Sequence, residues 1–159
     1  MHPFTPVCAH PARVLILGTW PSPKSRETGF YYGHPRNRFW PMLARLYGAE
    51  PPRTREEKEE LIRTHGLALW DVLASCEITG AADASIRAET PNDIPALCRE
   101  LGVRHVLCNG ATAYTLYQKH IPNGPAAEKL PSTSPANAAK SMDALCDAWG
   151  DALRRCGVL

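Results

Sequence analysis

The chain has 159 residues, which is enough to bury one sizeable core but short for two domains. Hydrophobic residues make up 44% and charged residues 21%, a balance that is ordinary for a globular protein and argues against long disorder. The formal net charge of +2 is too small to identify a polyanionic partner. No apolar run approaches the roughly 18 residues of a membrane span, and the amino terminus lacks a signal-peptide pattern. We expect one domain over residues 1–159, a monomer in the cytoplasm without membrane contact.

Charge is distributed unevenly along the chain. Residues 1–48 contain six basic side chains against one acidic side chain, whereas residues 49–102 contain six basic against eleven acidic. Clustered basic residues are the electrostatic footprint of a surface that faces a polyanion. If the protein has such a surface, the first third of the chain should build most of it.

The cysteines give no sign of a metal centre. There are six of them, scattered along the chain without a CxxC pair, so their spacing indicates neither a zinc site nor an iron–sulfur cluster. Free cysteines usually pack as small hydrophobic side chains. We therefore expect reduced, mostly buried thiols, and we expect the protein to use no metal and no other cofactor.

Strands, loops and helices alternate along the chain. Val14 to Leu17 is a continuous apolar run ending at Gly18, which is typical of a fully buried parallel strand. The loop from Gly18 to Pro35 is too long, and too rich in Pro, Gly, Ser and aromatic residues, for a simple connector. Further strands are predicted at Leu67 to Leu73, Val103 to Cys108 and a short segment ending at Leu130. Helices are predicted at Asn37 to Tyr47, 54–65 (with a capping box between Thr54 and Glu57), Pro91 to Leu101, Ala111 to His120 and Ala136 to Cys156.

This alternation predicts a three-layer α/β/α fold around a central, mostly parallel four-stranded sheet. In such a sheet, ligands bind beyond the carboxyl ends of the strands. The loops after Leu17, Leu69, Cys108 and Leu130 should therefore converge on one site. The sequence contains no GxGxxG, GxxxxGK[ST] or GxSxG motif, so dinucleotide binding, nucleoside triphosphate binding and serine-esterase chemistry have little support.

The twelve residues from Gly29 to Trp40 are the most informative stretch. They combine aromatic side chains, cations and an amide, and a base flipped out of a nucleic acid needs an aromatic face while its phosphates need cations. Phe39 and Trp40 are expected in the core, as part of the following helix. Tyr31 and Tyr32 precede that helix and have no such structural explanation.

These residues resemble the uracil-DNA glycosylase superfamily. The loop Gly18 to Ser25 and the helix start Gly33 to Trp40 are most similar to the branch of hypoxanthine (deoxyinosine) DNA glycosylases. The segments Leu69 to Leu73 and Leu130 to Pro135 fall at later motif positions, so the resemblance covers nearly the whole chain. It implies a DNA partner and hydrolytic excision of a deaminated base, hypoxanthine, in base excision repair.

The resemblance also implies roles for particular residues. Asn37 would position the hydrolytic water, and Tyr32 would stack on the flipped base. The segment Pro131 to Pro135 would press on the DNA backbone and fill the gap that the flipped nucleotide leaves. The remaining base-pocket residues would be Gly18, Thr19, Trp20, Pro21 and Trp70. Independently of the resemblance, the cations Lys24, Arg36 and Arg38 and the segment Ser132, Thr133 and Ser134 are expected to contact DNA, although Ser-rich segments before a helix are commonly only N-caps.

Two positions depart from the pattern of other branches. Trp20 stands where they carry a catalytic Asp or Asn, so the side chain of the first loop cannot hold a water. Leu130 stands where many relatives carry His or Asn as a donor to a uracil carbonyl. Both departures weaken uracil as the main substrate and leave base excision as the reaction. Asp71, a second catalytic candidate, has three open roles: reading a base edge, ordering the water or capping a loop.

Other functions compete with this interpretation. The chain could be a mismatch-type uracil-DNA glycosylase, a nucleic-acid-binding domain without catalysis or, with least support, a small-molecule hydrolase. Asn37 and Tyr32 together argue against a pure binding domain, because such a domain has no need to position a water. No lysine lies between Tyr31 and Trp40, which favours a monofunctional hydrolase over a Schiff-base lyase.

Overall fold

The computed structural model describes residues 4–77 and 87–159. In these residues five strands form one sheet in the order β1-β3-β2-β6-β7. Its strands are Val7–Cys8 (β1), Val14–Gly18 (β2), Leu67–Asp71 (β3), His105–Asn109 (β6) and Ala127–Leu130 (β7). β1 pairs antiparallel with β3, and the other pairings are parallel. The predicted α/β fold with a mostly parallel sheet is confirmed, and β1 adds an edge strand that was not predicted.

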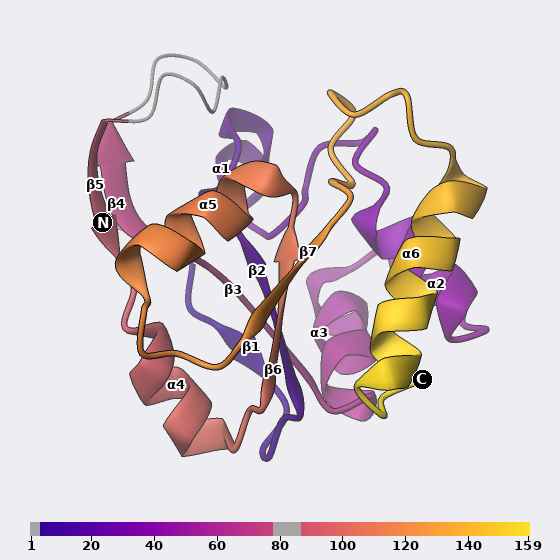
Figure 1. Cartoon of the computed structure of the whole chain (residues 1–159). Helices are drawn as coiled ribbons and strands as arrows, with labels where there is room; N and C mark the ends of the chain where they lie inside the picture. Colours follow the sequence, from indigo (N-terminus) through magenta and orange to yellow (C-terminus); the bar gives the residue numbers. More distant parts are fainter. Residues whose placement is uncertain (1–3, 78–86) are drawn as a thin grey trace.

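Helices cover both faces of the sheet. Phe39–Leu46 (α2), Arg55–Thr64 (α3) and Met142–Arg155 (α6) lie on one face, and Ile94–Leu101 (α4) and Ala111–His120 (α5) lie on the other (Figure 1). All five residues of the central strand β2 are buried. Val14 and Ile16 belong to the core under α2, α3 and α6, whereas Leu15 and Leu17 belong to the core under α4 and α5. Burial on both faces explains why this strand is apolar without alternation.

The chain leaves the main sheet directly after Asp71. Val72 N donates to Gly18 O at 2.8 Å, and the buried Asn92 donates from Nδ2 to Asp71 O at 2.9 Å and to Leu73 O at 3.2 Å. These bonds bend the chain into Leu73–Glu77 (β4), which pairs with Arg87–Pro91 (β5) in a separate two-stranded sheet. The predicted strand from Leu67 to Leu73 is therefore two residues too long.

α2 begins at Phe39, two residues after the predicted Asn37. Three other helices begin where the sequence did not predict a start, and a capping side chain sets each of these. Ser22 accepts from Ser25 N at 3.1 Å and opens Pro23–Thr28 (α1), a helix inside the long loop that was not predicted. Asp93 accepts from Ala96 N at 3.1 Å, so α4 begins after the predicted Pro91. Ser141 accepts from Ala144 N at 3.0 Å, so α6 begins at Met142 and not at Ala136.

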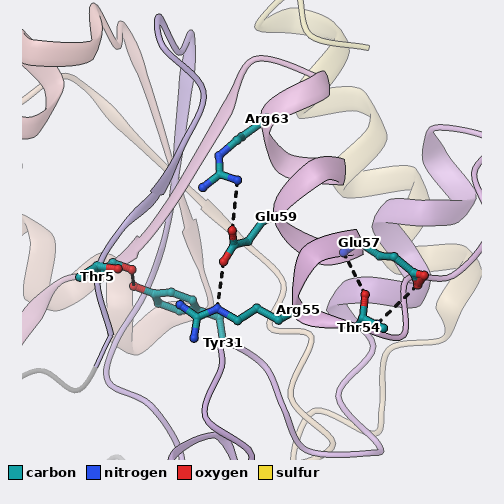
Figure 2. Close-up of polar contacts among 7 residues, drawn as sticks. All are labelled: Thr5, Tyr31, Thr54, Arg55, Glu57, Glu59 and Arg63. Atoms are coloured by element: carbon teal, nitrogen blue, oxygen red, sulfur yellow. Dashed lines mark hydrogen bonds and ion pairs between the residues drawn. The ribbon is translucent and has the colours of Figure 1, made fainter.

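Figure 2 shows the start of α3 and the environment of Tyr31. The predicted capping box is present, because Glu57 N donates to Thr54 Oγ1 at 3.1 Å and Glu57 accepts from Thr54 N in return. The Tyr31 hydroxyl donates to Thr5 O at 2.9 Å, and only 2% of Tyr31 is exposed. Tyr31 is therefore a core residue, which leaves Tyr32 as the tyrosine of this pair that a ligand can reach. Across the described part of the chain, every helix is too short or too polar to cross a membrane.

Candidate active site

The carboxyl ends of four strands meet at one edge of the sheet. Gly18 at the end of β2 lies opposite Asp71 at the end of β3, and Asn109 at the end of β6 lies opposite Leu130 at the end of β7. The segment before α2 and the segment before α6 run side by side above this edge (Figure 1), where Arg38 N donates to Thr133 O at 3.1 Å. The sequence prediction that these loops converge is thus confirmed.

Gly18 allows two functional groups to approach each other. A Cβ atom at this position would lie 2.5 Å from Asp71 Oδ1 and 3.0 Å from Tyr32 Oη. Only glycine leaves room for both oxygens here, since a contact of 2.5 Å is far inside van der Waals separation. Asp71 is 3% exposed, so its carboxylate is held in a largely dry environment beside the tyrosine hydroxyl. The structure therefore brings together three of the residues predicted for the site.

Tyr32 is held in an unusual conformation. Its φ of +53° lies in the left-handed region that residues other than glycine rarely adopt. One face of its ring stacks on Phe39, with the ring centroids 4.3 Å apart and the planes inclined by 29°. Such backbone conformations cost on the order of 1–3 kcal/mol and cluster at functional sites. Because Tyr32 is half-buried, the rest of the ring stays within reach of a ligand.

The hydroxyl of Tyr32 is a hydrogen-bond donor at neutral pH. Burial raises its pKa, the nearby Asp71 carboxylate raises it further, and the side chain of Asn109 opposes these shifts only in part. The hydroxyl is therefore protonated at neutral pH. Tyr32 Oη is buried and makes no hydrogen bond of standard geometry within residues 4–77 and 87–159. Its proton is therefore available to a ligand in the site.

Asn37 is held by a chain of hydrogen bonds that spans three segments. Its Oδ1 accepts from Phe39 N at 3.0 Å and from Thr133 Oγ1 at 2.9 Å. Thr133, which is fully buried, in turn accepts from Asn109 Nδ2 at its Oγ1 and donates from its own N–H to Asn109 Oδ1, both at 3.0 Å. Asn109 was not predicted as a site residue. Its place at the end of a buried strand, the same feature that indicated Asp71, was the signal that could have identified it.

The loop after β7 is fixed from several sides. Trp149 Nε1 in α6 donates to Pro131 O at 2.9 Å, and Asn137 Nδ2 donates to Ser132 O at 2.9 Å. The hydroxyl oxygen of Ser132 accepts from Ser134 N at 3.1 Å within a tight turn. The Ser132 side chain also packs against Gly110, where a Cβ atom would lie 3.2 Å from that of Ser132. A rigid loop of this kind can press into DNA without a large ordering cost.

The cationic residues predicted as DNA contacts have different surroundings. The exposed guanidinium of Arg36 has no ion pair within the described residues, whereas Lys24 pairs with Glu27 at 3.3 Å. Arg38 donates from its guanidinium to Asn137 O at 2.9 Å and to Lys140 O. Arg38 thus ties the start of α2 to the segment before α6.

The remaining predicted residues lie around the same edge. Thr133 differs most from its prediction as a DNA contact, because it is fully buried and its hydroxyl binds Asn37 instead of facing solvent. Thr19 O accepts from Leu73 N at 3.1 Å, and Pro21 is buried. Trp20 and Trp70 are half-buried against the core under α4 and α5. The Trp70 indole N–H is buried without a hydrogen bond to the part of the chain that the structure describes.

The described cysteines are free thiols. Cys8, Cys98, Cys108 and Cys146 are buried, and Cys156 is half-buried. Burial raises the pKa of Cys108 to about 12, so this thiol, which lies next to Asn109, is protonated and unreactive. The side chain of Cys76 lies outside the described residues. No three His, Cys, Asp or Glu side chains among those described are arranged to hold a metal ion.

Comparison with known proteins identifies the family of the chain. Residues 5–153 match the model of the uracil DNA glycosylase superfamily, so the chain belongs to this superfamily of DNA glycosylases. The chain is 28% identical over 155 residues to the hypoxanthine DNA glycosylase of Methanosarcina barkeri, covering 96% of this chain and 97% of that protein. It is 30% identical over 136 residues to the hypoxanthine DNA glycosylase of Methanosarcina acetivorans, covering 84% and 86%. A solution NMR structure from Methanosarcina acetivorans, described as a candidate uracil DNA glycosylase, superposes with a TM-score of 0.83 at 28% identity over 98% of both chains.

Proposed function

We propose that this protein is a monomeric, monofunctional DNA glycosylase that flips deoxyinosine out of DNA and releases hypoxanthine by hydrolysis. The observation that carries this proposal is the convergence of the Asp71 carboxylate and the Tyr32 hydroxyl at Gly18. The names of the two Methanosarcina relatives agree with the choice of base. Base stacking on Tyr32 and the rigid loop from Pro131 to Pro135 would together hold the nucleotide outside the duplex.

The buried acceptor and donor fit the edge of hypoxanthine that deamination creates. Hypoxanthine presents an N1–H donor and an O6 acceptor, whereas adenine presents an acceptor and a donor at the same positions. Asp71 would accept from N1–H, and Tyr32 would donate to O6. Adenine in this site would place its N1 acceptor against the carboxylate, so N1 would be buried without a donor. Mismatches of this kind give strong discrimination, because each unpaired buried group costs about 1–3 kcal/mol.

The reaction breaks the bond between C1′ of deoxyribose and N9 of the base. The electron pair of that bond leaves with hypoxanthine, the sugar becomes cation-like, and a water oxygen bonds to C1′ while its proton goes to solvent. The base anion takes up a proton as it departs. An amide is too weak a base to deprotonate water, so Asn37 would position the water, and preorganised polar groups would lower most of the barrier.

A panel of labelled oligonucleotides tests this function. Each oligonucleotide carries hypoxanthine, uracil, xanthine or thymine opposite each normal base, and single-turnover release of the base is measured for each. We expect hypoxanthine to be released fastest. Fastest release of uracil would contradict the proposed substrate. Binding without release of any base would indicate a nucleic-acid-binding domain that lacks catalysis.

Uracil is the second candidate substrate, for a specific chemical reason. Its N3–H and O4 form the same donor and acceptor pair as N1–H and O6 of hypoxanthine, so Asp71 and Tyr32 could bind either base. The description of the similar NMR structure points the same way. Against uracil stands Leu130, a buried apolar residue at the end of β7 that offers no donor to a second carbonyl.

Arg36 and Arg38 should affect DNA binding differently. We expect Arg36→Ala to weaken binding to damaged and undamaged DNA alike and to lower the salt dependence by about one phosphate contact. Arg38→Ala should release the segment at Asn137 and Lys140, so it should lower the melting temperature and the rate of base release as well. Fluorescence anisotropy at several salt concentrations, together with thermal unfolding, separates the two effects. An Arg38→Ala variant that unfolds like the wild type and changes only the salt dependence would make Arg38 a simple phosphate contact.

A further inference from the structure

We propose that Asn109 and Thr133 are positioning residues that fix the direction of the Asn37 side-chain amide, so that its NH₂ group faces the catalytic water. This inference rests on the proposed hydrolytic role of Asn37. It adds two residues to the machinery and changes the chemistry expected of Asn37, which would donate a hydrogen bond to the water instead of accepting one from it.

The direction of the hydrogen-bond chain is set at Asn109. Thr133 N is a backbone donor, so the Asn109 atom that it contacts at 3.0 Å must be the carbonyl oxygen Oδ1. The other end of the same amide, Nδ2, therefore lies 3.0 Å from Thr133 Oγ1 and donates to it. This double contact leaves only one orientation for the Asn109 amide, although nitrogen and oxygen have nearly the same shape.

The direction then passes to Asn37. Because Thr133 Oγ1 already accepts from Asn109, its single proton is free to donate to Asn37 at 2.9 Å. Phe39 N, which can only donate, contacts the same Asn37 atom at 3.0 Å. Two donors meet at this atom, so it must be Oδ1. The NH₂ group of Asn37 makes no hydrogen bond to any other described residue, and the side chain is half-buried at the edge of the site.

A donor at this place suits the reaction. An N–H group that holds one lone pair of the water leaves the other lone pair to attack C1′. The cation-like sugar is a strong electrophile, so the water needs correct orientation more than it needs a strong base. If the amide turned over, its oxygen would compete for a water proton, and Phe39 N and Thr133 Oγ1 would each face a second donor. The wrong orientation would therefore be disfavoured at both ends.

Thr133→Val tests the hydrogen bond from the Thr133 hydroxyl to Asn37. Valine has nearly the shape of threonine but no hydroxyl, so only Phe39 N would still hold the amide direction. We expect base release in single turnover to slow by at least about tenfold while the affinity for DNA changes less than about twofold, as loss of one preorganised group implies. Thr133→Ser keeps the hydroxyl and should restore the rate to within about threefold of the wild type. Equal rates for Thr133→Val and Thr133→Ser would overturn the proposal.

Asn109→Asp tests the direction itself through a pH profile. The new carboxylate can still accept from Thr133 N, but it cannot donate to Thr133 Oγ1, so the hydroxyl proton turns toward it and away from Asn37. We expect a rate at neutral pH at least about tenfold below wild type, rising as the pH falls through the pKa of the new carboxyl, because its protonated form regains a donor. Asn123→Asp, at an exposed position remote from the site, adds the same charge and should show no such rise. A pH profile of Asn109→Asp parallel to that of Asn123→Asp would contradict the proposal.

Hydrogen exchange of the side-chain amides gives a readout that is independent of catalysis. In nitrogen-labelled wild-type protein, the NH₂ signals can be assigned from their loss in Asn37→Asp and Asn109→Asp. We expect the NH₂ protons of Asn37 to exchange rapidly and those of Asn109 slowly. Slow exchange at Asn37 would place its oxygen toward the water and overturn the inference. A wild-type protein that releases no base would instead refute the proposed function, and the exchange result would still establish the amide direction.

Discussion

Asn37→Ala is expected to release hypoxanthine at least about a hundredfold more slowly than the wild type in single turnover, by analogy with the loss of one preorganised polar group in other enzymes. Trp20 stands where other branches carry an Asp or Asn, so the first loop offers no second carboxylate or amide to take over the role of Asn37. The structure adds a second effect, because Asn37 Oδ1 accepts from Phe39 N at 3.0 Å at the start of α2. Asn37 precedes the N-cap residue Arg38, and losing its hydrogen bond to the first helical residue costs about 0.5–1.5 kcal/mol of stability. Rapid-quench kinetics and thermal unfolding measure the two effects separately.

Asn37→Asp is the matched control for this variant. It keeps the oxygen that accepts from Phe39 N and Thr133 Oγ1, so the melting temperature should stay closer to wild type. The new carboxylate can accept a proton from water and stabilise the sugar cation, so the variant should retain more activity than Asn37→Ala. A rate for Asn37→Ala within about threefold of wild type, with a lower melting temperature, would give Asn37 only a structural role at the start of α2. Asp71 would then be the next candidate to hold the water.

Gly18→Ala should combine a loss of stability with a loss of activity. The added methyl group would lie 2.5 Å from Asp71 Oδ1 and 3.0 Å from Tyr32 Oη, so at least one of these groups must move. Forcing an extra methyl into a packed site costs about 1–3 kcal/mol. We expect a similar loss of transition-state stabilisation, which corresponds to a rate roughly 10- to 100-fold below wild type, because both proposed base contacts shift together.

Gly48→Ala is a control that should lower stability without lowering activity, whereas Gly18→Ala should lower both. Gly48 follows α2, has a φ of +63°, and has open space where the Cβ atom would be. Alanine there should cost about 1 kcal/mol through backbone strain and leave the rate of base release unchanged. If Gly18→Ala also released hypoxanthine at the wild-type rate, then Asp71 and Tyr32 would not have to meet at Gly18 for catalysis.

The sequence correctly predicted those elements whose signal lies within the element itself. β2 was predicted from its unbroken apolar run, and α3 was predicted from a capping box that is present. β1 is only two residues long, so it carries no periodicity. The end of β3 depends on Asn92, a residue 21 positions away that bonds Asp71 O. No pattern within the strand could have indicated that bend.

In the candidate site too, some residues had a signal in the sequence and others depend on tertiary contacts. Tyr32 was predicted from the family resemblance, whereas Gly18 and Asp71 were candidates because each ends a buried strand. The structure brings the three together. Thr133 was predicted from a Ser- and Thr-rich segment as a surface contact, whereas it is fully buried and bonds Asn37 across 96 positions of sequence. Which hydroxyl in such a segment faces inward is decided by tertiary packing. A single sequence contains no direct signal for that choice.

The tether between Trp149 and Pro131 has a consequence for how the enzyme matures on the ribosome. Asn37 depends on Thr133, and the loop that carries Thr133 is anchored by the fully buried Trp149 of α6. Most of the sheet strands are synthesised well before this helix, so a nascent chain can assemble them while the glycosylase centre is still unfinished. The last component to arrive is thus the one that completes the site. If Asn37 acts as proposed, we expect base release to begin only after α6 has been made and has packed against Pro131.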